Sequence, residues 1–268
     1  MKSKWGGHWT HQLFVEKPNL FLPFLAARMK QGRKDATAIT LILKRLGLKK
    51  GARILDLCCG IGRISVPLAK KGFRVVGVDL SPDYVRRARD LAKANQVSAR
   101  TKFIVGDYRQ IGHTLAKEER FDCILSIFTS IGYYGRETDA ATFAQLAKDT
   151  SKSGVFIIDT VNRDWLLRHF ERKGWEMAGN VLVLEERRFD AERSYMVNKW
   201  EYFRVVGANL LSEGIYEVDH RVYSPVELRE LLESTGWKVR SISRDFEGGQ
   251  IDLKLPEGSQ IIAVAQRR

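Results

Sequence analysis

The chain has 268 residues, of which 44% are hydrophobic, and it carries a formal net charge of +13. This composition excludes a disordered chain, and no apolar run approaches the roughly 18–20 residues that a membrane span needs. The amino terminus lacks the apolar core of a signal peptide, so we expect a cytoplasmic protein with no membrane association. The three cysteines are too few for a disulfide scaffold, and they lie in apolar runs typical of a protein core.

The positive charge is unevenly distributed along the chain. Residues 1–53 hold 12 Lys and Arg against 2 Asp and Glu, whereas residues 163–222 hold 10 against 11. A basic segment attracts phosphate groups, either of RNA or of a small substrate. An ordinary solvated surface has the same composition, so the charge by itself leaves the partner open.

The chain begins with two predicted helices, over 20–32 and 34–46, the second of which ends at Gly47. Short apolar runs then alternate with helical segments. Strands are expected at 53–58, 73–79, 102–107, 121–127 and 155–161, with helices at 64–71, 82–94 and 138–150. Apolar strands that alternate with helices predict a parallel sheet covered on both faces.

Three β-rich segments interrupt this alternation and predict an antiparallel meander. They lie at 181–189, 195–206 and 215–222, and a helix over 224–236 and strands at 238–246 and 260–266 follow them. We therefore predict an α/β fold with a Rossmann-like, doubly wound, mostly parallel seven-stranded sheet, into which the meander is inserted as a lid. The predicted domains are a helical cap over 1–35, the Rossmann-like domain over 36–162 and 223–268, and the lid over 163–222.

Small and acidic residues follow the first three predicted strands. In an open parallel sheet, ligands bind beyond the carboxyl ends of the strands. Gly60 and Gly62 allow the backbone to approach a ligand closely after the first strand. Asp79 ends the second strand, at the spacing where a carboxylate accepts hydrogen bonds from a ribose. Asp107 and Tyr108 end the third strand and suit the amino group and the ring of an adenine.

In this order, these residues resemble the motifs of class I S-adenosylmethionine-dependent methyltransferases. The segment 54–62 matches the first motif of the family, with Cys58 in place of its first glycine. Further matches are Asp79, 106–107, 121–134 and 223–266. The resemblance covers roughly 36–162 and 223–267. The segment 128–133 and the β insertion are also similar to small-molecule N-methyltransferases, including those that act on amino sugars attached to nucleotides.

The resemblance implies that S-adenosyl-L-methionine is the cofactor, that S-adenosyl-L-homocysteine is its product, and that no metal takes part. Asp56, Gly60 and Gly62 would hold the methionine part. Asp79 would bind the ribose hydroxyls, and Phe128 would line the pocket near the sulfonium. The full set of expected cofactor residues is Asp56, Cys58, Gly60, Gly62, Arg63, Asp79, Leu80, Asp107, Tyr108 and Phe128.

A nicotinamide-binding fold is the alternative interpretation of the glycine loop. That fold expects a third glycine three residues after Gly62, where this chain has Ser65. The acidic and aromatic pair at 107–108 also suits adenine better than nicotinamide.

Methyl transfer is an in-line displacement from an activated donor, so the protein mainly has to position the acceptor in a dry pocket. An ammonium acceptor must first lose a proton, directly or through water. The candidate bases are Tyr133, Tyr134 and His220, with Asp159 as a further carboxylate. His220 shares a predicted strand face with apolar residues, a pattern that is more often that of a structural histidine.

Residues beyond the fifth predicted strand are expected to face the acceptor. Asn162 and Arg163 follow that strand directly, and Arg163 would pair with an anionic acceptor, although a surface arginine has the same pattern. Trp200 and Tyr202 share one face of the middle strand of the insertion and belong either to the core of the lid or to the wall of the acceptor site. Closing such a lid would exclude water.

We therefore predict transfer of a methyl group to a small-molecule acceptor, at nitrogen. The alternative is an RNA methyltransferase that uses the basic amino-terminal segment. Against this alternative, the insertion is slightly acidic, and the segment after the fourth strand lacks an Asn-Pro-Pro-Tyr type of motif. A cofactor-binding protein without enzymatic activity is a third interpretation, and the acceptor and the oligomeric state, monomer or dimer, stay open.

Overall fold

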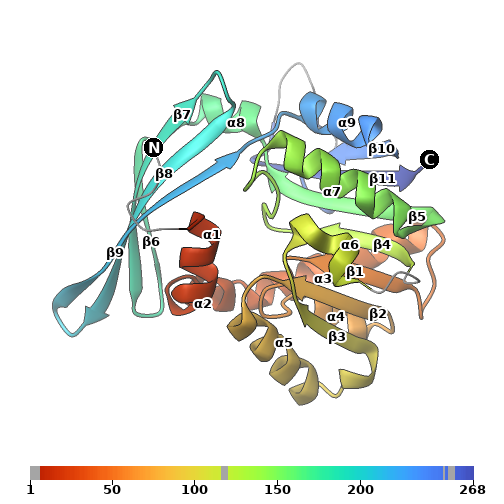
Figure 1. Cartoon of the computed structure of the whole chain (residues 1–268), viewed down its shortest axis with the longest axis horizontal. Helices are drawn as coiled ribbons and strands as arrows, with labels where there is room; N and C mark the ends of the chain where they lie inside the picture. The colour runs from red at the N-terminus through yellow and green to blue at the C-terminus, as the bar shows by residue number, and fades with distance from the viewer. Residues whose placement is uncertain (1–6, 116–119, 250, 253–256) are drawn as a thin grey trace.

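The computed structural model of the chain describes residues 7–115, 120–249, 251–252 and 257–268. Its central sheet has seven strands that lie in the order Trp237–Ser243 (β10), Gln260–Arg267 (β11), Thr150–Val161 (β5), Phe121–Ser126 (β4), Arg53–Leu57 (β1), Arg74–Asp79 (β2) and Thr101–Val105 (β3) (Figure 1). Strands β1 to β5 pair in parallel, and β11 is antiparallel to both of its neighbours. The predicted seven-stranded, mostly parallel sheet is confirmed.

The order of the strands fixes where a ligand can bind. The chain steps outward from β1 through β2 to β3 and then returns to β4 on the other side of β1. This reversal leaves a crevice beyond the carboxyl ends of β1 and β4, because the two connections run in opposite directions. The predicted cofactor residues follow β1, β2, β3 and β4, and so they gather at this edge.

Helices cover both faces of the central sheet. On one face lie Met29–Arg45 (α3), Ser65–Lys70 (α4) and Pro82–Ala94 (α5), and on the other lie Ile111–Thr114 (α6), Arg136–Lys148 (α7) and Pro225–Ser234 (α9). Successive strand residues such as Ile54 and Leu55 are both fully buried, in the cores of opposite faces. The apolar runs seen in the sequence therefore reflect burial on both faces.

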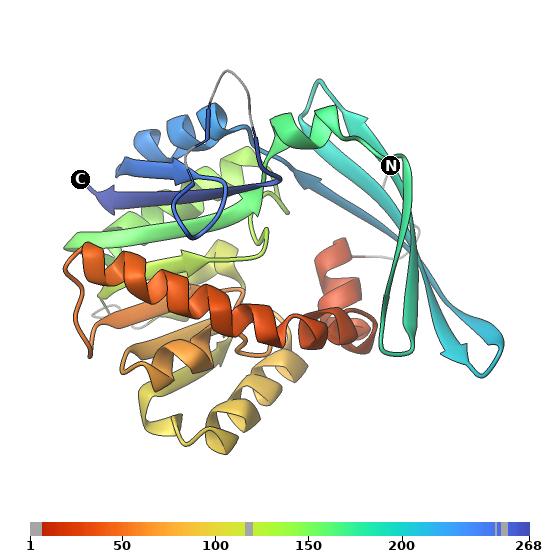
Figure 2. The same ribbon diagram turned by 180° about the vertical axis from the view of Figure 1, so that it is seen from behind.

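A second sheet of four antiparallel strands stands beyond the carboxyl edge of the first (Figure 2). Its strands are Lys173–Ala178 (β6), Val181–Asp190 (β7), Tyr195–Val206 (β8) and Asn209–Arg221 (β9), and the short helix Arg163–Arg168 (α8) leads into it. The meander thus has four strands where the sequence pattern predicted three. The large apolar residues of β6, Trp175 and Met177, are exposed, so β6 lacks the half-buried alternation that identifies a strand.

The amino-terminal helices connect the two sheets. They are Trp9–His11 (α1), the π-helical turn Gln12–Glu16 (η1) and Pro18–Ala27 (α2). They share a small core with the four-stranded sheet, made of Trp9, Leu13, Leu20, Phe24, Ala178, Val181, Val183, Tyr202 and Val218. This core holds the four-stranded sheet against the rest of the molecule, because it buries apolar side chains from both.

Two predicted helix boundaries are corrected by the structure. The pattern predicted a break near residue 33, but α2 ends at Ala27 and α3 begins at Met29. Arg28 lies between them, and its Nη1 donates to the carbonyl of Phe24 (3.1 Å), which caps the last turn of α2. The predicted end at Gly47 is confirmed, since Gly47 follows α3 with a left-handed φ of 84°. In the part of the chain that the structure describes, no helix has both the length and the apolar content to cross a membrane.

Candidate functional site

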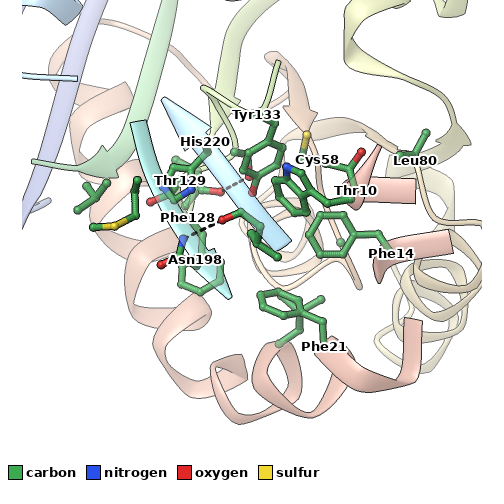
Figure 3. A pocket seen from close by; sticks show the side chains of 18 of the residues that line it. Thr10, Phe14, Phe21, Cys58, Leu80, Phe128, Thr129, Tyr133, Asn198 and His220 are labelled. Atoms are coloured by element: carbon green, nitrogen blue, oxygen red, sulfur yellow. Dashed lines mark hydrogen bonds between the residues drawn. The ribbon is translucent and has the colours of Figure 1, made fainter. Parts of the chain in front are cut away.

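A cavity of about 700 Å³ lies between the carboxyl edge of the central sheet, the amino-terminal helices and the four-stranded sheet; we call it the sheet-edge cavity. Figure 3 shows side chains from all three parts pointing toward one another, among them Phe21, Phe128 and Asn198. One end of the cavity holds the predicted cofactor residues, and the other is the inner face of the four-stranded sheet.

Asp79 links the ends of β1 and β2 at the cofactor end of the cavity. Its Oδ2 accepts a hydrogen bond from the backbone N–H of Gly60 (2.8 Å), and its Oδ1 accepts one from Ser81 (2.9 Å). Burial raises the pKa of Asp79 to about 6, although these two hydrogen bonds oppose the rise. The carboxylate is therefore ionised at neutral pH and held in place, as a group that accepts hydrogen bonds from a ribose must be.

Asp56 lies in β1, opposite Gly77 of β2. Its Oδ2 accepts a hydrogen bond of 2.5 Å from the Ser65 hydroxyl at the start of α4. Burial also raises the pKa of Asp56 to about 6. Both Asp56 and Cys58 line the cavity, whereas Gly62 packs against α5, where an added Cβ would lie 3.2 Å from the Ala88 Cβ. Gly62 thus lets α5 approach the loop that follows β1.

Cys58 stands where the motif that this segment resembles has a glycine, and its backbone is strained. Its φ is 54°, in the left-handed region that glycine adopts without strain. The sulfur is half-buried at the cavity wall, and burial raises the pKa of the thiol well above its usual value. Cys58 is therefore a neutral wall residue in a strained backbone position, beside the unstrained left-handed turn at Gly60.

The predicted adenine residues follow β3. Asp107 caps the short helical turn at 108–110 and forms an ion pair with Arg109. Partial burial raises the pKa of Asp107, but the hydrogen bonds from Arg109 outweigh it and lower the pKa overall. Tyr108 is buried, and the Arg109 guanidinium lies 3.9 Å from the ring centroid of Tyr134. The structure therefore places Tyr134 beside the predicted adenine residues, and its hydroxyl is hydrogen-bonded to Thr10 (2.6 Å).

The loop after β4 is held in a strained conformation. Phe128 and Thr129 have φ values of 67° and 53°, which non-glycine residues rarely adopt. Asp159 of β5 holds both, because its Oδ2 accepts from Phe128 N–H (3.0 Å) and its carbonyl accepts from Thr129 N–H (2.9 Å). The Phe128 ring lies between the guanidinium groups of Arg28 (5.0 Å) and Arg63 (5.3 Å) and lines the cavity. Strained backbone that surrounding contacts hold in place is typical of functional loops.

Arg63 and Leu80, two further predicted cofactor residues, also line the cavity. Arg63 is buried, and its Nη1 forms an ion pair with Asp35 of α3 (3.1 Å). This pair ties the start of the α4 segment to α3, and it leaves the opposite side of the guanidinium over the Phe128 ring.

Aromatic side chains from distant parts of the chain line the other end of the sheet-edge cavity, toward the four-stranded sheet, where the acceptor is expected; we call it the acceptor end. Trp9 and Phe14 come from the amino-terminal helices, and the Trp9 ring meets that of Tyr133 edge-on (4.9 Å). Phe21 of α2 stacks parallel to Trp200 of β8 (6.3 Å between centroids). Trp9 and Phe14 were missed in the sequence, where no apolar periodicity marks the short α1 and η1 segments.

His220 of β9 faces this aromatic wall. Its ring lies edge-on to Tyr133 (6.4 Å) and lines the cavity. Burial lowers the pKa of His220 to about 4, because the charged imidazolium is poorly solvated there. Burial raises the pKa of the Tyr133 hydroxyl well above its usual value. At neutral pH the acceptor end therefore presents a neutral imidazole and a protonated phenol.

Polar residues of the four-stranded sheet were also missed. Register places Glu185 opposite Trp200 and Arg187 opposite Asn198, and all four line the cavity. Glu185 and Arg187 form an ion pair, and Asn198 is buried with its Nδ2 donating to Val218 O (3.0 Å). The strand period of two, extended from Trp200 to Asn198, is the signal that would have found Asn198.

Three predicted acceptor residues lie outside the cavity lining, and each has partners of its own. Asn162 is buried and caps α8 by accepting from Asp164 N–H (3.1 Å). Arg163 pairs with Glu227 of α9 (2.6 Å), so it ties α8 to α9. Tyr202 is buried in the core under the amino-terminal helices. Of the predicted acceptor set, Trp200 alone lines the cavity among the described residues. No cluster of metal-ligating side chains occurs within the described ranges.

Comparisons with known proteins agree with this geometry. Residues 54–154 match the family described as methyltransferase domain. A Neisseria lactamica protein named 23S rRNA (uracil(1939)-C(5))-methyltransferase is 36% identical over 107 residues, which cover 39% of this chain and 24% of that protein. A Geobacillus protein that carries a methyltransferase name is 33% identical over 118 residues, covering 44% of this chain and 45% of its own length. The chain thus spans less than half the length of either relative.

Solved structures share the fold over most of the chain. A crystal structure of a Clostridium acetobutylicum S-adenosylmethionine-dependent methyltransferase has a TM-score of 0.73 at 17% identity, covering 87% of this chain and 91% of that one. A sugar N-methyltransferase from Streptoalloteichus has a TM-score of 0.69 at 17% identity, covering 100% and 97%. Residues 54–154 therefore match a methyltransferase domain, and the chain shares its fold with solved S-adenosylmethionine-dependent methyltransferases.

Proposed function

We propose that this chain transfers the methyl group of S-adenosyl-L-methionine to a nitrogen atom of a small-molecule amine bound in the sheet-edge cavity. The observation that carries the proposal is that one cavity holds both halves of such a site. Asp79 and Phe128 lie at its cofactor end, and Trp200 and His220 lie on the facing strands of the four-stranded sheet. The cofactor would lie along the carboxyl edge of β1 and β2, with its methyl group directed at the acceptor.

The donor is already activated, so orientation supplies much of the catalysis. Holding two reactants in line contributes on the order of 7–11 kcal/mol to lowering the barrier. The aromatic walls formed by Phe21, Tyr133 and Trp200 favour a positively charged amine through their ring faces. The same walls exclude water from the cationic sulfonium. The ion pair of Glu185 and Arg187 would meet the polar groups of the acceptor at the far side of the cavity.

An amine attacks only after it loses its extra proton. We propose that His220 takes this proton, directly or through water, because its lowered pKa keeps the imidazole neutral at physiological pH. Tyr133 stays protonated and can donate a hydrogen bond to the acceptor. The similarity to a sugar N-methyltransferase over the whole chain supports nitrogen as the methylated atom.

Calorimetry with S-adenosyl-L-homocysteine tests the cofactor half of the proposal. The wild-type protein should bind, and Asp79→Ala should bind at least about tenfold more weakly, because two charge-assisted hydrogen bonds to the ribose are lost. Asp90→Ala is the matched control, since Asp90 is an exposed aspartate of α5 outside the cavity. Absence of binding by the wild type at millimolar ligand would refute the proposal.

RNA methylation is the second candidate, favoured by the relative named as an rRNA methyltransferase and by the basic amino-terminal segment. A salt titration separates the two candidates. An RNA substrate should lose affinity steeply as salt rises, since counterions are released from phosphates, whereas a small amine should not. Methyl transfer to RNA, together with a steep salt dependence, would overturn the small-molecule proposal.

A further inference from the structure

A second hollow, of about 660 Å³, lies at the opposite edge of the central sheet from the sheet-edge cavity. Its lining residues come from the end of α3, the loop before β1, and the end of α4 before β2. Five lysines line it, namely Lys44, Lys49, Lys50, Lys70 and Lys71. We call it the lysine hollow. The sheet-edge cavity lies beyond the carboxyl ends of β1 and β2, so the length of the strands separates the two sites.

The lysine hollow concentrates positive charge without a compensating acid. Of the nine described residues that line it, five are lysines and none is acidic. The Lys70 ammonium donates to the amide oxygen of Asn95 (3.2 Å), and among the described residues none of the five forms an ion pair with a carboxylate. Like charges gathered around one hollow raise the local potential and attract multivalent anions. This feature accounts for part of the basic charge seen in 1–53.

Helix ends explain only some of these lysines. Lys44 and Lys70 lie in the last turns of α3 and α4, where a cation stabilises the helix dipole. Lys71 is the C-cap residue that follows α4. Lys49 and Lys50 lie beyond α3, in a loop where no helix end requires them.

The backbone that carries the loop lysines is held in place. Gly51 N–H donates to Gly72 O (2.8 Å), which joins the loop before β1 to the turn before β2. The stem of Lys50 packs on Gly72, whose φ is 101° and where an added Cβ would lie 3.2 Å from the Lys50 Cγ. Phe73 is buried beneath and, with Leu48, forms an apolar floor. A preformed rim lowers the entropy cost of binding an anion.

We propose that the lysine hollow binds a ligand with adjacent phosphate groups, at a site separate from the sheet-edge cavity. Lysine ammoniums act as point charges on phosphate oxygens, and several around one hollow match several adjacent phosphates. The phosphates belong either to a compact polyphosphate or to the backbone of a nucleic acid. A nucleic acid bound at this hollow would contact the molecule at the edge of the sheet opposite the cavity.

Calorimetry with inorganic tripolyphosphate at low salt tests the proposal. The wild type should bind, and the double variant Lys49→Glu/Lys50→Glu should bind at least about tenfold more weakly, because two charged contacts become repulsive. The control is Lys173→Glu/Lys238→Glu, which makes the same change in net charge at exposed positions of β6 and β10 outside the hollow. The control should bind within about twofold of the wild type, and all three proteins should bind S-adenosyl-L-homocysteine equally.

Two results would overturn the proposal. One is an absence of binding by the wild type at millimolar tripolyphosphate. The other is an equal loss of tripolyphosphate affinity in both double variants, which would show general attraction to a basic protein.

Two further results would support the proposal and identify the source of the phosphates. Displacement of a labelled oligouridylate by tripolyphosphate would identify a nucleic-acid backbone, whereas tripolyphosphate binding with no oligouridylate binding would identify a compact polyphosphate. Binding of S-adenosyl-L-homocysteine at the sheet-edge cavity is measured separately. A negative result with tripolyphosphate therefore does not bear on the proposed methyl transfer.

Discussion

At the scale of single residues, the cofactor end of the sheet-edge cavity is built from buried groups held by backbone hydrogen bonds. Asp79 is buried among the ends of β1 and β2 and accepts from two N–H groups before any ligand arrives. Burial removes water from the Asp79 carboxylate and so disfavours its charged form, which raises its pKa to about 6. Asp159 is likewise a buried aspartate that accepts backbone hydrogen bonds, and it holds the strained backbone of Phe128 and Thr129.

The raised pKa of Asp79 predicts a pH dependence of cofactor binding. A ribose donates to the ionised carboxylate, so binding lowers the pKa of Asp79 and releases protons near pH 6. At pH 5 roughly one molecule in eleven has Asp79 ionised, so affinity for S-adenosyl-L-homocysteine should fall about tenfold from pH 7 to pH 5. Calorimetry in buffers of different ionisation enthalpy measures both effects.

Asp56 also has a pKa of about 6, so the variant Asp79→Asn separates the two carboxylates. This variant should bind weakly at every pH and keep only the smaller dependence that Asp56 contributes. Constant wild-type affinity from pH 5 to pH 8, or proton uptake on binding, would contradict the role given to Asp79.

Gly132 is a position where the fold tolerates no side chain. Its φ is 86°, and an added Cβ would lie 2.1 Å from the carbonyl oxygen of Arg221, where β9 passes the loop after β4. Gly132→Ala should lower the free energy of unfolding by about 3 kcal/mol or more, since the loop and β9 must move apart. Gly207→Ala is the matched control, because Gly207 is also left-handed (φ 59°) but has open space around it.

The control should cost only about 1 kcal/mol, the strain of a left-handed alanine. Urea unfolding of both variants measures the difference. Equal destabilisation by the two substitutions would mean that the close approach of β9 to Gly132 does not constrain the fold.

At the scale of elements, Glu227 joins three segments. It completes the capping box of α9 by accepting from Ser224 N–H (2.9 Å), and it also pairs with Arg163 of α8 (2.6 Å) and Arg221 of β9 (3.2 Å). The sequence pattern predicted the cap, and the structure adds the two arginines. One carboxylate therefore anchors both ends of the four-stranded segment to α9.

Glu227→Gln should lower the free energy of unfolding by about 1–3 kcal/mol, because Arg221 loses its carboxylate partner and Arg163 keeps only Asp164. Glu230→Gln, at an exposed position of the same helix, should change it by less than about 0.5 kcal/mol. Thermal and urea unfolding measure both variants. A loss no larger at Glu227 than at Glu230 would show that these ion pairs are solvated and contribute little.

At the scale of the whole molecule, the sheet-edge cavity unites three distant parts of the chain. The amino-terminal helices supply Trp9 and Phe21, the loop after β4 supplies Tyr133, and the four-stranded sheet supplies Trp200 and His220. If methyl transfer takes place there, cofactor binding and acceptor binding depend on different layers of the fold and can be separated by mutation.

Trp200→Ala should bind S-adenosyl-L-homocysteine within about threefold of the wild type, yet lose at least about tenfold in methyl transfer to a small amine, because the acceptor loses an aromatic wall. Leu184→Ala is the control, since Leu184 is an exposed residue of the neighbouring strand outside the cavity lining. Product formation over a panel of small amines gives the transfer rate. Unchanged transfer in Trp200→Ala would place the acceptor elsewhere.

The central sheet could be predicted from the sequence because its strands and helices are local patterns. Apolar runs such as 54–57 and the caps of α5 and α9 depend on neighbouring residues, and parallel strands necessarily bring Asp79 and the 58–62 loop to one edge. The same logic predicted that 195–206 is a strand with Trp200 and Tyr202 on one face.

The contacts between elements were decided by the tertiary structure alone. A strand period shows which residues of β8 share a face, but it does not show that Tyr202 packs under Phe24 while Trp200 lines a cavity. Arg163 turns to Glu227, and the lysines of 44–50 meet those of 70–71, because chain segments far apart in sequence pack together. The spacing of apolar residues indicates which face of a strand or helix is buried. Which element packs on that face is set by the tertiary structure.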